Sequence, residues 1–273
     1  MDLVAYELKS LWAALVCYAL VAVFSIIGVV FRREFPRILP SLIVMGVALH
    51  TAAIGFRWVY LDRVPVGNSF EMLSANLWGL MIAVGIGYWL LPRMRSFAAV
   101  LMPIIIMLMA WLLLKSTASA MVPPTYKTVW LYIHIGLIKL FLGAAFIALG
   151  ISGIVILRKT AWGLDRFAHL PTNNVLDDRA YRFMAVALIF DSLGISAGAI
   201  WAQDAWGRYW NWDSLEIWSL LTWLSIALAL HVRTPFKTTP LANAWLTVGV
   251  FAVAFFTFFG IPFVSTALHK GQI

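Results

Sequence analysis

The histidines are the residues of this 273-residue chain whose type and placement best suit chemistry. There are five, and four of them lie within or beside long apolar runs: His50, His134, His231 and His269. An imidazole can bind a metal ion, carry a proton or hydrogen-bond a neighbouring element. Its role depends on what the surrounding segments place beside it. The fifth, His169, lies in a basic, polar stretch and is predicted to be a solvated loop residue.

A second concentration of functional side chains is the run WAQDAWGRYWNWDSLEIWSLLTW, which contains six tryptophans. Trp206 and Trp210 are four residues apart, so a helical segment would place both on one face. Gly207 removes side-chain bulk beside them, and Trp212 and Asp213 follow. Large flat rings beside a small residue suit a large flat ligand. The same composition is also typical of the aromatic belt that tryptophan forms at a membrane interface.

Composition indicates where the chain folds. Hydrophobic residues make up 63% of the sequence and charged residues only 12%, whereas soluble domains carry about 25% charged residues. A water-soluble domain of this length could not bury so much apolar surface. The sequence therefore predicts an integral membrane protein with an all-α, polytopic fold.

Eight apolar runs of about 20 residues are long enough to span a bilayer as helices. They are predicted to form a single integral membrane domain over residues 1–273, with the tryptophan-rich segment at about 201–218. The fourth run contains Pro103, which a transmembrane helix tolerates as a kink. The predicted spans are Leu11–Phe31, Ile38–Phe56, Met72–Leu91, Phe97–Leu114, Leu131–Leu157, Phe183–Trp201, Ile217–Arg233 and Leu241–Phe263.

Basic residues divide the predicted connections into two sides. One side carries 12 basic residues against four acidic ones, and the other carries seven of each. Because cytoplasmic loops are enriched in Lys and Arg, the first side is predicted to be cytoplasmic and both termini to face outward. The net charge of +8 is thereby a topology signal, and it implies no nucleic-acid partner. The basic side consists of residues 32–37, 92–96, 158–182 and 234–240, together with Arg233.

This topology sorts the four membrane-associated histidines into two pairs. His50 and His231 fall inside spans, whereas His134 and His269 lie at the outer face. Ionisable side chains at membrane depth commonly mark functional sites, and two facing imidazoles suit the axial positions of a haem iron. For any one of these histidines, a hydrogen bond to a neighbouring helix is an equally good interpretation.

A third segment, RWVYLDRVPVGNSFEMLSANLWG, is predicted at the outer face between the second and third spans. Asn68 and Glu71 are spaced like a helix N-cap and its third residue, and this role explains Asn68 as well as a ligand contact would. Arg57 and Arg63 could pair with carboxylates such as haem propionates. The favoured interpretation is that both arginines snorkel to the membrane interface.

The motifs resemble those of a known family. The tryptophan-rich run is similar to the WWD signature of haem-handling membrane proteins, and its flanks are most similar to the CcsA (ResC) branch, which serves system II cytochrome c biogenesis. That branch also has a His-x-Arg, matched at residues 231–233, and a P-x-x-N-x-x-E stretch, matched at residues 65–71. Residues 203–204 and 214–215 depart from the family pattern but leave the tryptophans intact.

The resemblance implies a reaction and a ligand set. The family carries haem b to the outer face, where its vinyl groups react with the two thiols of a CxxCH motif in an apocytochrome c. The resemblance assigns outer axial ligands to His134 and His269 and intramembrane ligands to His50 and His231. It assigns the haem platform to the WWD residues Trp206, Gly207, Trp210, Trp212 and Asp213.

The resemblance also implies partners: a membrane subunit of the CcsB (ResB) type, the apocytochrome c and a thioredoxin-like thiol reductant. The expected location is the bacterial plasma membrane, with the thylakoid as the alternative. Three functions stay open: a cytochrome c synthase component, a haem exporter or carrier without synthase activity, and a scaffold whose tryptophans only form a belt. The chain has a single cysteine, Cys17, which suits a protein that acts on the thiols of its substrate.

Overall fold

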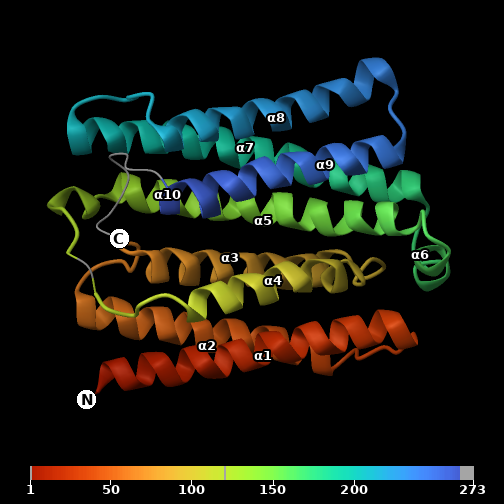
Figure 1. Cartoon of the computed structure of the whole chain (residues 1–273), viewed down its shortest axis with the longest axis horizontal. Coiled ribbons are helices and arrows are strands. Elements are labelled where there is room, and N and C mark those ends of the chain that lie inside the picture. Colours follow the sequence, from red (N-terminus) through yellow and green to blue (C-terminus); the bar gives the residue numbers. More distant parts are fainter. Residues whose placement is uncertain (1, 120, 265–273) are drawn as a thin grey trace. The chain divides into compact units, whose positions relative to one another are not determined.

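A computed structural model describes residues 2–119 and 121–264, most of which are helical (Figure 1). Within these ranges the chain forms no β-strand. Seven of the described helices are long and apolar enough to cross a membrane, and the apolar helix α4 (Phe97–Leu113) is shorter, at 17 residues. At 1.5 Å per residue α4 is about 26 Å long, close to the hydrocarbon thickness of about 30 Å. The predicted all-α, polytopic membrane fold is therefore confirmed.

The helices form two compact units. In the first unit, α1 packs along α2 and also contacts α4, while α3 contacts both α2 and α4. The close approach of α1 and α2 depends on Gly46, because a Cβ atom there would lie 2.7 Å from the ring of Tyr18. This unit contains α1 (Leu3–Phe31), α2 (Ile38–Leu61), α3 (Ser69–Leu90), α4 and the short α6 (Ala161–Arg166).

The second unit contains the tryptophan-rich segment. Its helix α8 packs on α7 and α9, and α9 also contacts α7. Phe146 of α5 and Phe251 of α9 bring those two helices together, with ring centroids 5.6 Å apart. The elements of this unit are η1 (Pro124–Tyr126), α5 (Val129–Leu157), α7 (Asn173–Trp206), α8 (Ser214–Phe236), α9 (Pro240–Phe255), the π-helical turn η2 (Phe256–Gly260) and α10 (Ile261–Val264).

Two helices begin well before the residues at which hydropathy predicts them to start. The α1 helix begins at Leu3 rather than Leu11, and the Asp2 carboxylate caps it by accepting a hydrogen bond from the Ala5 N–H at 3.1 Å. The α7 helix begins at Asn173 rather than Phe183, and its first turns carry several charged residues. Polar helical turns lower the mean hydropathy without breaking the helix, so a window that detects apolar runs misses them.

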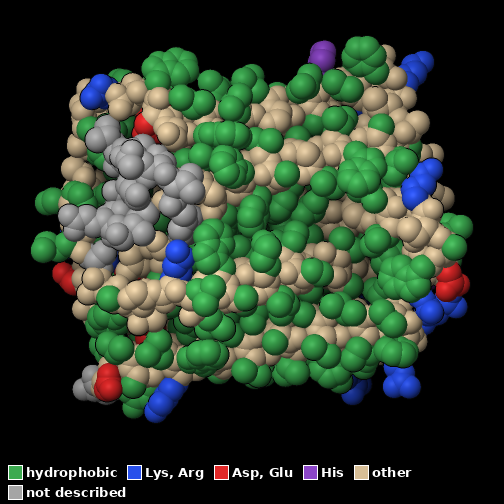
Figure 2. Space-filling model, viewed as in Figure 1, with side chains coloured by type: hydrophobic (Ala, Val, Ile, Leu, Met, Phe, Trp, Pro, Cys, Tyr) green, Lys and Arg blue, Asp and Glu red, His purple; other side chains and the backbone are tan. Residues whose placement is uncertain are grey.

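Charged side chains in each unit gather toward the helix ends, while apolar side chains cover most of the middle of the helices (Figure 2). A chain that crosses a bilayer requires this distribution, because a charge in the hydrocarbon region is costly. The single integral membrane domain predicted from the sequence depends on how the two units are joined, and it stays a prediction.

Candidate functional site

The tryptophan-rich segment forms the end of α7, a short loop and the start of α8. After Trp206 the chain turns at Gly207, which has a φ of 77° and donates its N–H to the Gln203 carbonyl at 2.9 Å. A Cβ atom on Gly207 would meet no heavy atom of the described residues within 4 Å. The backbone angle therefore requires the glycine here. That its missing side chain also makes room for a ligand stays a prediction.

Asp213 and Glu216 fix the other end of the loop. The Asp213 carboxylate accepts hydrogen bonds from the N–H groups of Leu215 at 2.9 Å and Glu216 at 3.0 Å. The Glu216 carboxylate accepts from the N–H groups of Asn211 at 2.7 Å and Asp213 at 3.4 Å. This reciprocal arrangement is a capping box, which satisfies the free N–H groups at the start of α8.

A cavity lies beneath this loop, within the second unit, with about 60 Å³ of space open to the centres of water-sized molecules. Helices α5, α7 and α8, the loop itself and η2 all contribute to its wall. Aromatic and aliphatic side chains predominate, with a few polar groups among them. The lining residues are His134, Ile138, Ile195, Gly198, Ala199, Trp201, Tyr209, Trp210, Leu215, Glu216, Ser219 and Phe258.

His134 of α5 is the imidazole in the cavity wall. Its Nδ1 lies 2.7 Å from the carbonyl oxygen of Gly194 on α7. A carbonyl oxygen only accepts hydrogen bonds, so Nδ1 must carry the proton, and in the neutral ring the lone pair is then on Nε2. Histidines that bind metals commonly have one ring nitrogen fixed in this way. Its predicted partner, His269, lies outside the described residues.

Trp201 supports the His134 ring. The two rings stack with their centroids 6.4 Å apart and their planes 19° apart. The Trp201 Nε1–H donates to the Thr125 carbonyl at 3.0 Å, and Tyr126 packs against the indole with an interplanar angle of 90°. Burial raises the pKa of the Tyr126 phenol. Trp206 packs on Trp201 from the loop side, with centroids 4.9 Å apart.

The predicted platform residues take different places. Trp210 lines the cavity, whereas Trp206 packs behind the wall. Gly207 and Asp213 shape the two ends of the loop. Trp212 has a φ of 59° and is 67% exposed, and its ring packs against Trp210 with centroids 5.8 Å apart. Among these five residues of the described chain, Trp210 is therefore the one in the cavity wall.

The cavity wall also contains residues that were not predicted from the sequence. Trp201 and Tyr209 belong to the tryptophan-rich run, while Leu215 and Ser219 follow it on α8. Leu215 and Ser219 are four residues apart, so helical spacing counted from a cap at Asp213 would have placed them on one face. Phe258 has no comparable local signal, because it comes from the distant η2 turn.

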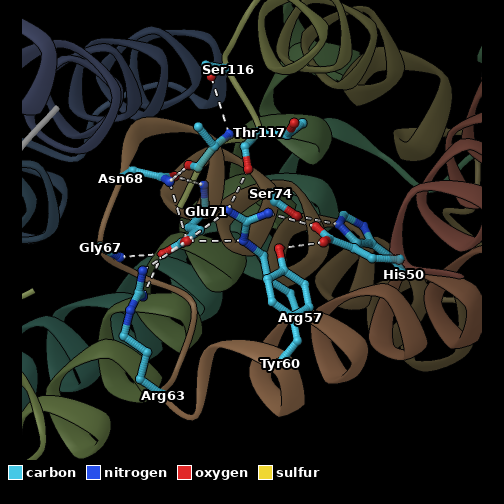
Figure 3. Close-up of polar contacts among 12 residues, drawn as sticks. His50, Arg57, Tyr60, Arg63, Gly67, Asn68, Glu71, Ser74, Ser116 and Thr117 are labelled. Carbon is cyan, nitrogen blue, oxygen red and sulfur yellow. Dashed lines mark hydrogen bonds and ion pairs between the residues drawn. The ribbon is translucent and has the colours of Figure 1, made fainter. Parts of the chain in front are cut away.

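His50 of α2 is fully buried in the first unit. Its Nδ1 lies 3.2 Å from the Tyr18 hydroxyl of α1, and its Nε2 lies 2.9 Å from the Ser74 hydroxyl of α3. Figure 3 shows Ser74 beside the ring. Hydrogen bonding to neighbouring helices therefore describes His50 here. His231 lies exposed on α8 in the second unit, and its pairing with His50 stays a prediction.

Four charged residues form a buried ion cluster: Glu7, Arg57, Arg63 and Glu71. Figure 3 shows the last three of them, together with His50. The Arg57 side chain is 3% exposed and contacts Glu7 and Glu71, each at 3.0 Å. Arg63 donates to Glu71 at 2.8 Å. The prediction that both arginines snorkel is wrong, because protein carboxylates pair with them. One of these carboxylates comes from α1, far away in sequence.

The predicted helix cap next to this cluster is confirmed. The Asn68 side-chain oxygen accepts from the Glu71 N–H at 2.8 Å. The Glu71 carboxylate accepts in turn from the Gly67 N–H at 2.6 Å. The Asn68 amide nitrogen donates to the Ala118 carbonyl at 2.7 Å, and Arg57 donates to the Thr117 carbonyl at 3.0 Å. The cluster thus fixes the segment that follows α4 as well as the start of α3.

The family model that matches this chain is described as "Cytochrome C assembly protein" and covers residues 66–269. The chain belongs to this family. The match includes the loop and every residue that lines the cavity. Membership means that the protein serves cytochrome c biogenesis.

Several curated relatives carry the name "Cytochrome c biogenesis protein CcsA". The one from Prochlorococcus marinus (strain MIT 9312) is 27% identical over 97% of this chain and 94% of its own length. The one from Guillardia theta is 29% identical over 81% of this chain and 80% of its own. The one from Carica papaya is 25% identical over 81% and 82%. The resemblance to the CcsA branch is therefore confirmed.

Solved structures with a similar fold include a haem lyase. The cytochrome c heme lyase CcmF matches 95% of this chain with a TM-score of 0.72 and 15% sequence identity. The chain spans about half the length of that protein, since the match covers 47% of it. This likeness shows a common fold of membrane-spanning helices.

Proposed function

We propose that this protein binds haem in the cavity beside His134 and presents it for covalent attachment to an apocytochrome c. The family assigns the protein to cytochrome c biogenesis. The observation that carries the proposal is the His134 ring, which Gly194 fixes with its basic nitrogen at Nε2 in the wall of an aromatic cavity. Neutral imidazole of this kind is a common axial ligand of haem iron.

The cavity residues fit a haem b substrate. The wall is mostly apolar and aromatic with a few polar groups, as is typical of small-molecule and cofactor sites. Trp201, Tyr209 and Trp210 offer flat rings on which a macrocycle can pack. His134 supplies one axial ligand in this proposal, and His269 supplies the second.

The residues of this chain bind and orient the reactants. Each thiol of the apocytochrome CxxCH motif adds across one vinyl group: sulfur bonds to one vinyl carbon and the thiol proton passes to the other. This addition consumes no oxidant or reductant. The thiols come from the substrate, because Cys17 is buried in α1. Holding thiol and vinyl group close together can contribute several of the roughly 7–11 kcal/mol available from proximity.

Replacement of His134 tests the outer site. In a His134→Gly variant we expect the haem recovered with the purified protein to fall several-fold, because an axial ligand is lost. Added imidazole should restore part of it, since the space of the missing ring admits the free molecule. Absorption spectra and cytochrome c yield in cells measure both effects. His169→Ala, at an exposed position, is the control and should match the wild type. Unchanged haem content in His134→Gly would contradict the site.

We propose that His50 and His231 form a relay through which haem reaches the outer site. For His50 this requires the exchange of one hydrogen bond, to Tyr18 or Ser74, for a bond to iron. His50→Ala and His231→Ala should each lower cytochrome c yield at matched protein levels, and haem supplied from outside should restore it. Full maturation in both variants without added haem would leave these histidines as structural residues.

The proposed assembly contains a CcsB (ResB)-type membrane subunit, with a thioredoxin-like reductant that keeps the substrate thiols reduced. It lies in a bacterial plasma membrane, with the thylakoid as the alternative. Its WWD loop and both termini face outward. A haem exporter would use the same site without forming thioether bonds. Co-expression with an apocytochrome c separates the two functions, because only a synthase component yields covalently attached haem.

A further inference from the structure

We propose that Gly198 of α7 is a positioning residue for His134: the space left by its missing side chain receives the imidazole ring. This inference rests on the proposed haem site and concerns how the protein aims its ligand. The local sequence around Gly198, with Gly194 four positions before it, predicts helix packing and gives no sign of a role at the haem site. The structure assigns it this role through its contacts.

The contacts of Gly198 are specific to the imidazole. A Cβ atom built on Gly198 would lie 2.7 Å from His134 Nδ1, 2.8 Å from Cε1 and 3.5 Å from Cγ. These are the three nearest heavy atoms outside its own helix segment, and all belong to one rigid ring. Carbon atoms do not approach nitrogen or carbon at 2.7 or 2.8 Å without repulsion. Any side chain at residue 198 therefore has to displace the ring.

The ring is also held in its plane. Its Nδ1 donates to the Gly194 carbonyl at 2.7 Å, one helical turn before Gly198. In an α-helix this carbonyl also accepts the N–H of Gly198, so the two glycines belong to one backbone turn. Trp201 stacks on the ring at 6.4 Å. The Gly194 carbonyl, the side-chain-free surface of the helix at Gly198 and the Trp201 indole together fix the orientation of the ring, and so the direction in which Nε2 points.

The two glycines have separate roles. A Cβ atom on Gly194 would lie 2.8 Å from Cδ1 of Ile138, so Gly194 allows α5 and α7 to pack closely. A pair of small residues four positions apart commonly serves such packing in membranes. Gly198 faces His134, and it also lines the cavity. Helix propensity favours alanine over glycine in the interior of α7, so the glycine at residue 198 serves a purpose other than helix stability.

The test compares Gly198→Ala with Gly249→Ala. Gly249 is the matched control, because it also lies within a helix of the second unit and a Cβ atom there would meet nothing within 4 Å. We expect Gly198→Ala to lose haem several-fold and to alter the absorption spectrum, while Gly249→Ala matches the wild type. Protein yield and thermal unfolding of both variants show whether each one folds.

A second comparison keeps the inference testable if Gly198→Ala folds poorly. The His134→Gly variant lacks the ring, so the added methyl group then has space. In this background Gly198→Ala should fold like the single variant, but it should need about tenfold more imidazole for the same haem recovery. The extra methyl group occupies part of the space that free imidazole must enter.

The outcomes separate the two proposals. Wild-type haem content and spectrum in Gly198→Ala, with His134→Gly still defective, would overturn the role of Gly198 alone. An equal imidazole requirement with and without the alanine would also overturn it. Wild-type haem content in His134→Gly would instead overturn the haem site on which the inference rests.

Discussion

Trp212 combines two properties that seldom occur together in one residue. Its φ of 59° lies in the left-handed region, and its side chain is 67% exposed. Bulky residues avoid this conformation because Cβ crowds the following carbonyl, at a cost of roughly 1–2 kcal/mol. An exposed tryptophan between two membrane helices suits the bilayer interface, but that role requires no particular φ. The loop between Gly207 and the cap at Asp213 is short, and its path imposes the angle.

This strain predicts an unusual order of stability at residue 212. The free energy of unfolding of Trp212→Gly should exceed that of Trp212→Ala by about 1 kcal/mol, because both variants lose the ring and only glycine accepts the angle freely. The glycine variant should therefore unfold at the higher temperature. Thermal unfolding of the purified protein in detergent measures the difference. At Trp245, exposed within α9, the order should reverse, because glycine is the poorer helix former. An alanine variant at residue 212 as stable as the glycine variant would contradict the strain.

Some residues of the site could be predicted from the sequence and others could not. The place of His134 beside an apolar run made it a candidate ligand, the family resemblance implied its haem role, and the motif drew attention to Trp210. Gly198 carries a local signal, since Gly194 lies four positions before it, but the spacing alone predicts helix packing. The burial of Arg57 has no local signal, because its partner Glu7 is 50 residues away.

At the scale of elements, hydropathy located all eight apolar helices and missed their polar ends. The helix cap at Asn68 could be predicted because the residues that form it are three positions apart. The buried ion cluster could not, because it joins the ends of α1, α2 and α3 through side chains from three helices. Buried charges are costly unless each has a partner, so these three helix ends depend on one another.

The cluster predicts a large loss of stability from a small change. Glu71→Gln keeps the shape of the side chain but leaves Arg57 and Arg63 without a full countercharge. We expect the free energy of unfolding to fall by about 3–5 kcal/mol. Asp178→Asn is the control, because its ion pair with Arg182 is exposed and contributes about 0.5 kcal/mol or less. Similar effects of the two substitutions in a denaturation experiment would show that the cluster does not hold the helix ends together.

At the scale of the whole molecule, the basic connections predict the orientation in the membrane. A reporter inserted after Arg95 or within residues 172–178 should show a cytoplasmic location, and a reporter at the C-terminus should show the outer compartment. Compartment-specific reporters, such as an enzyme active on one side only, measure this directly. Reporters after Arg95 and after Lys270 on the same side of the membrane would contradict eight spans.

The two hydrogen bonds of His50 have a kinetic consequence for the proposed relay. A ligand that binds either ring nitrogen must replace the hydroxyl of Tyr18 or Ser74. A net hydrogen bond of about 1 kcal/mol lowers the affinity of such a ligand about fivefold. The same hydroxyl is in place to bond the nitrogen again as the ligand departs, which shortens the residence time. In the proposed relay, the rate at which haem crosses the membrane then depends on how quickly His50 releases haem. Weak binding at His50 raises this rate.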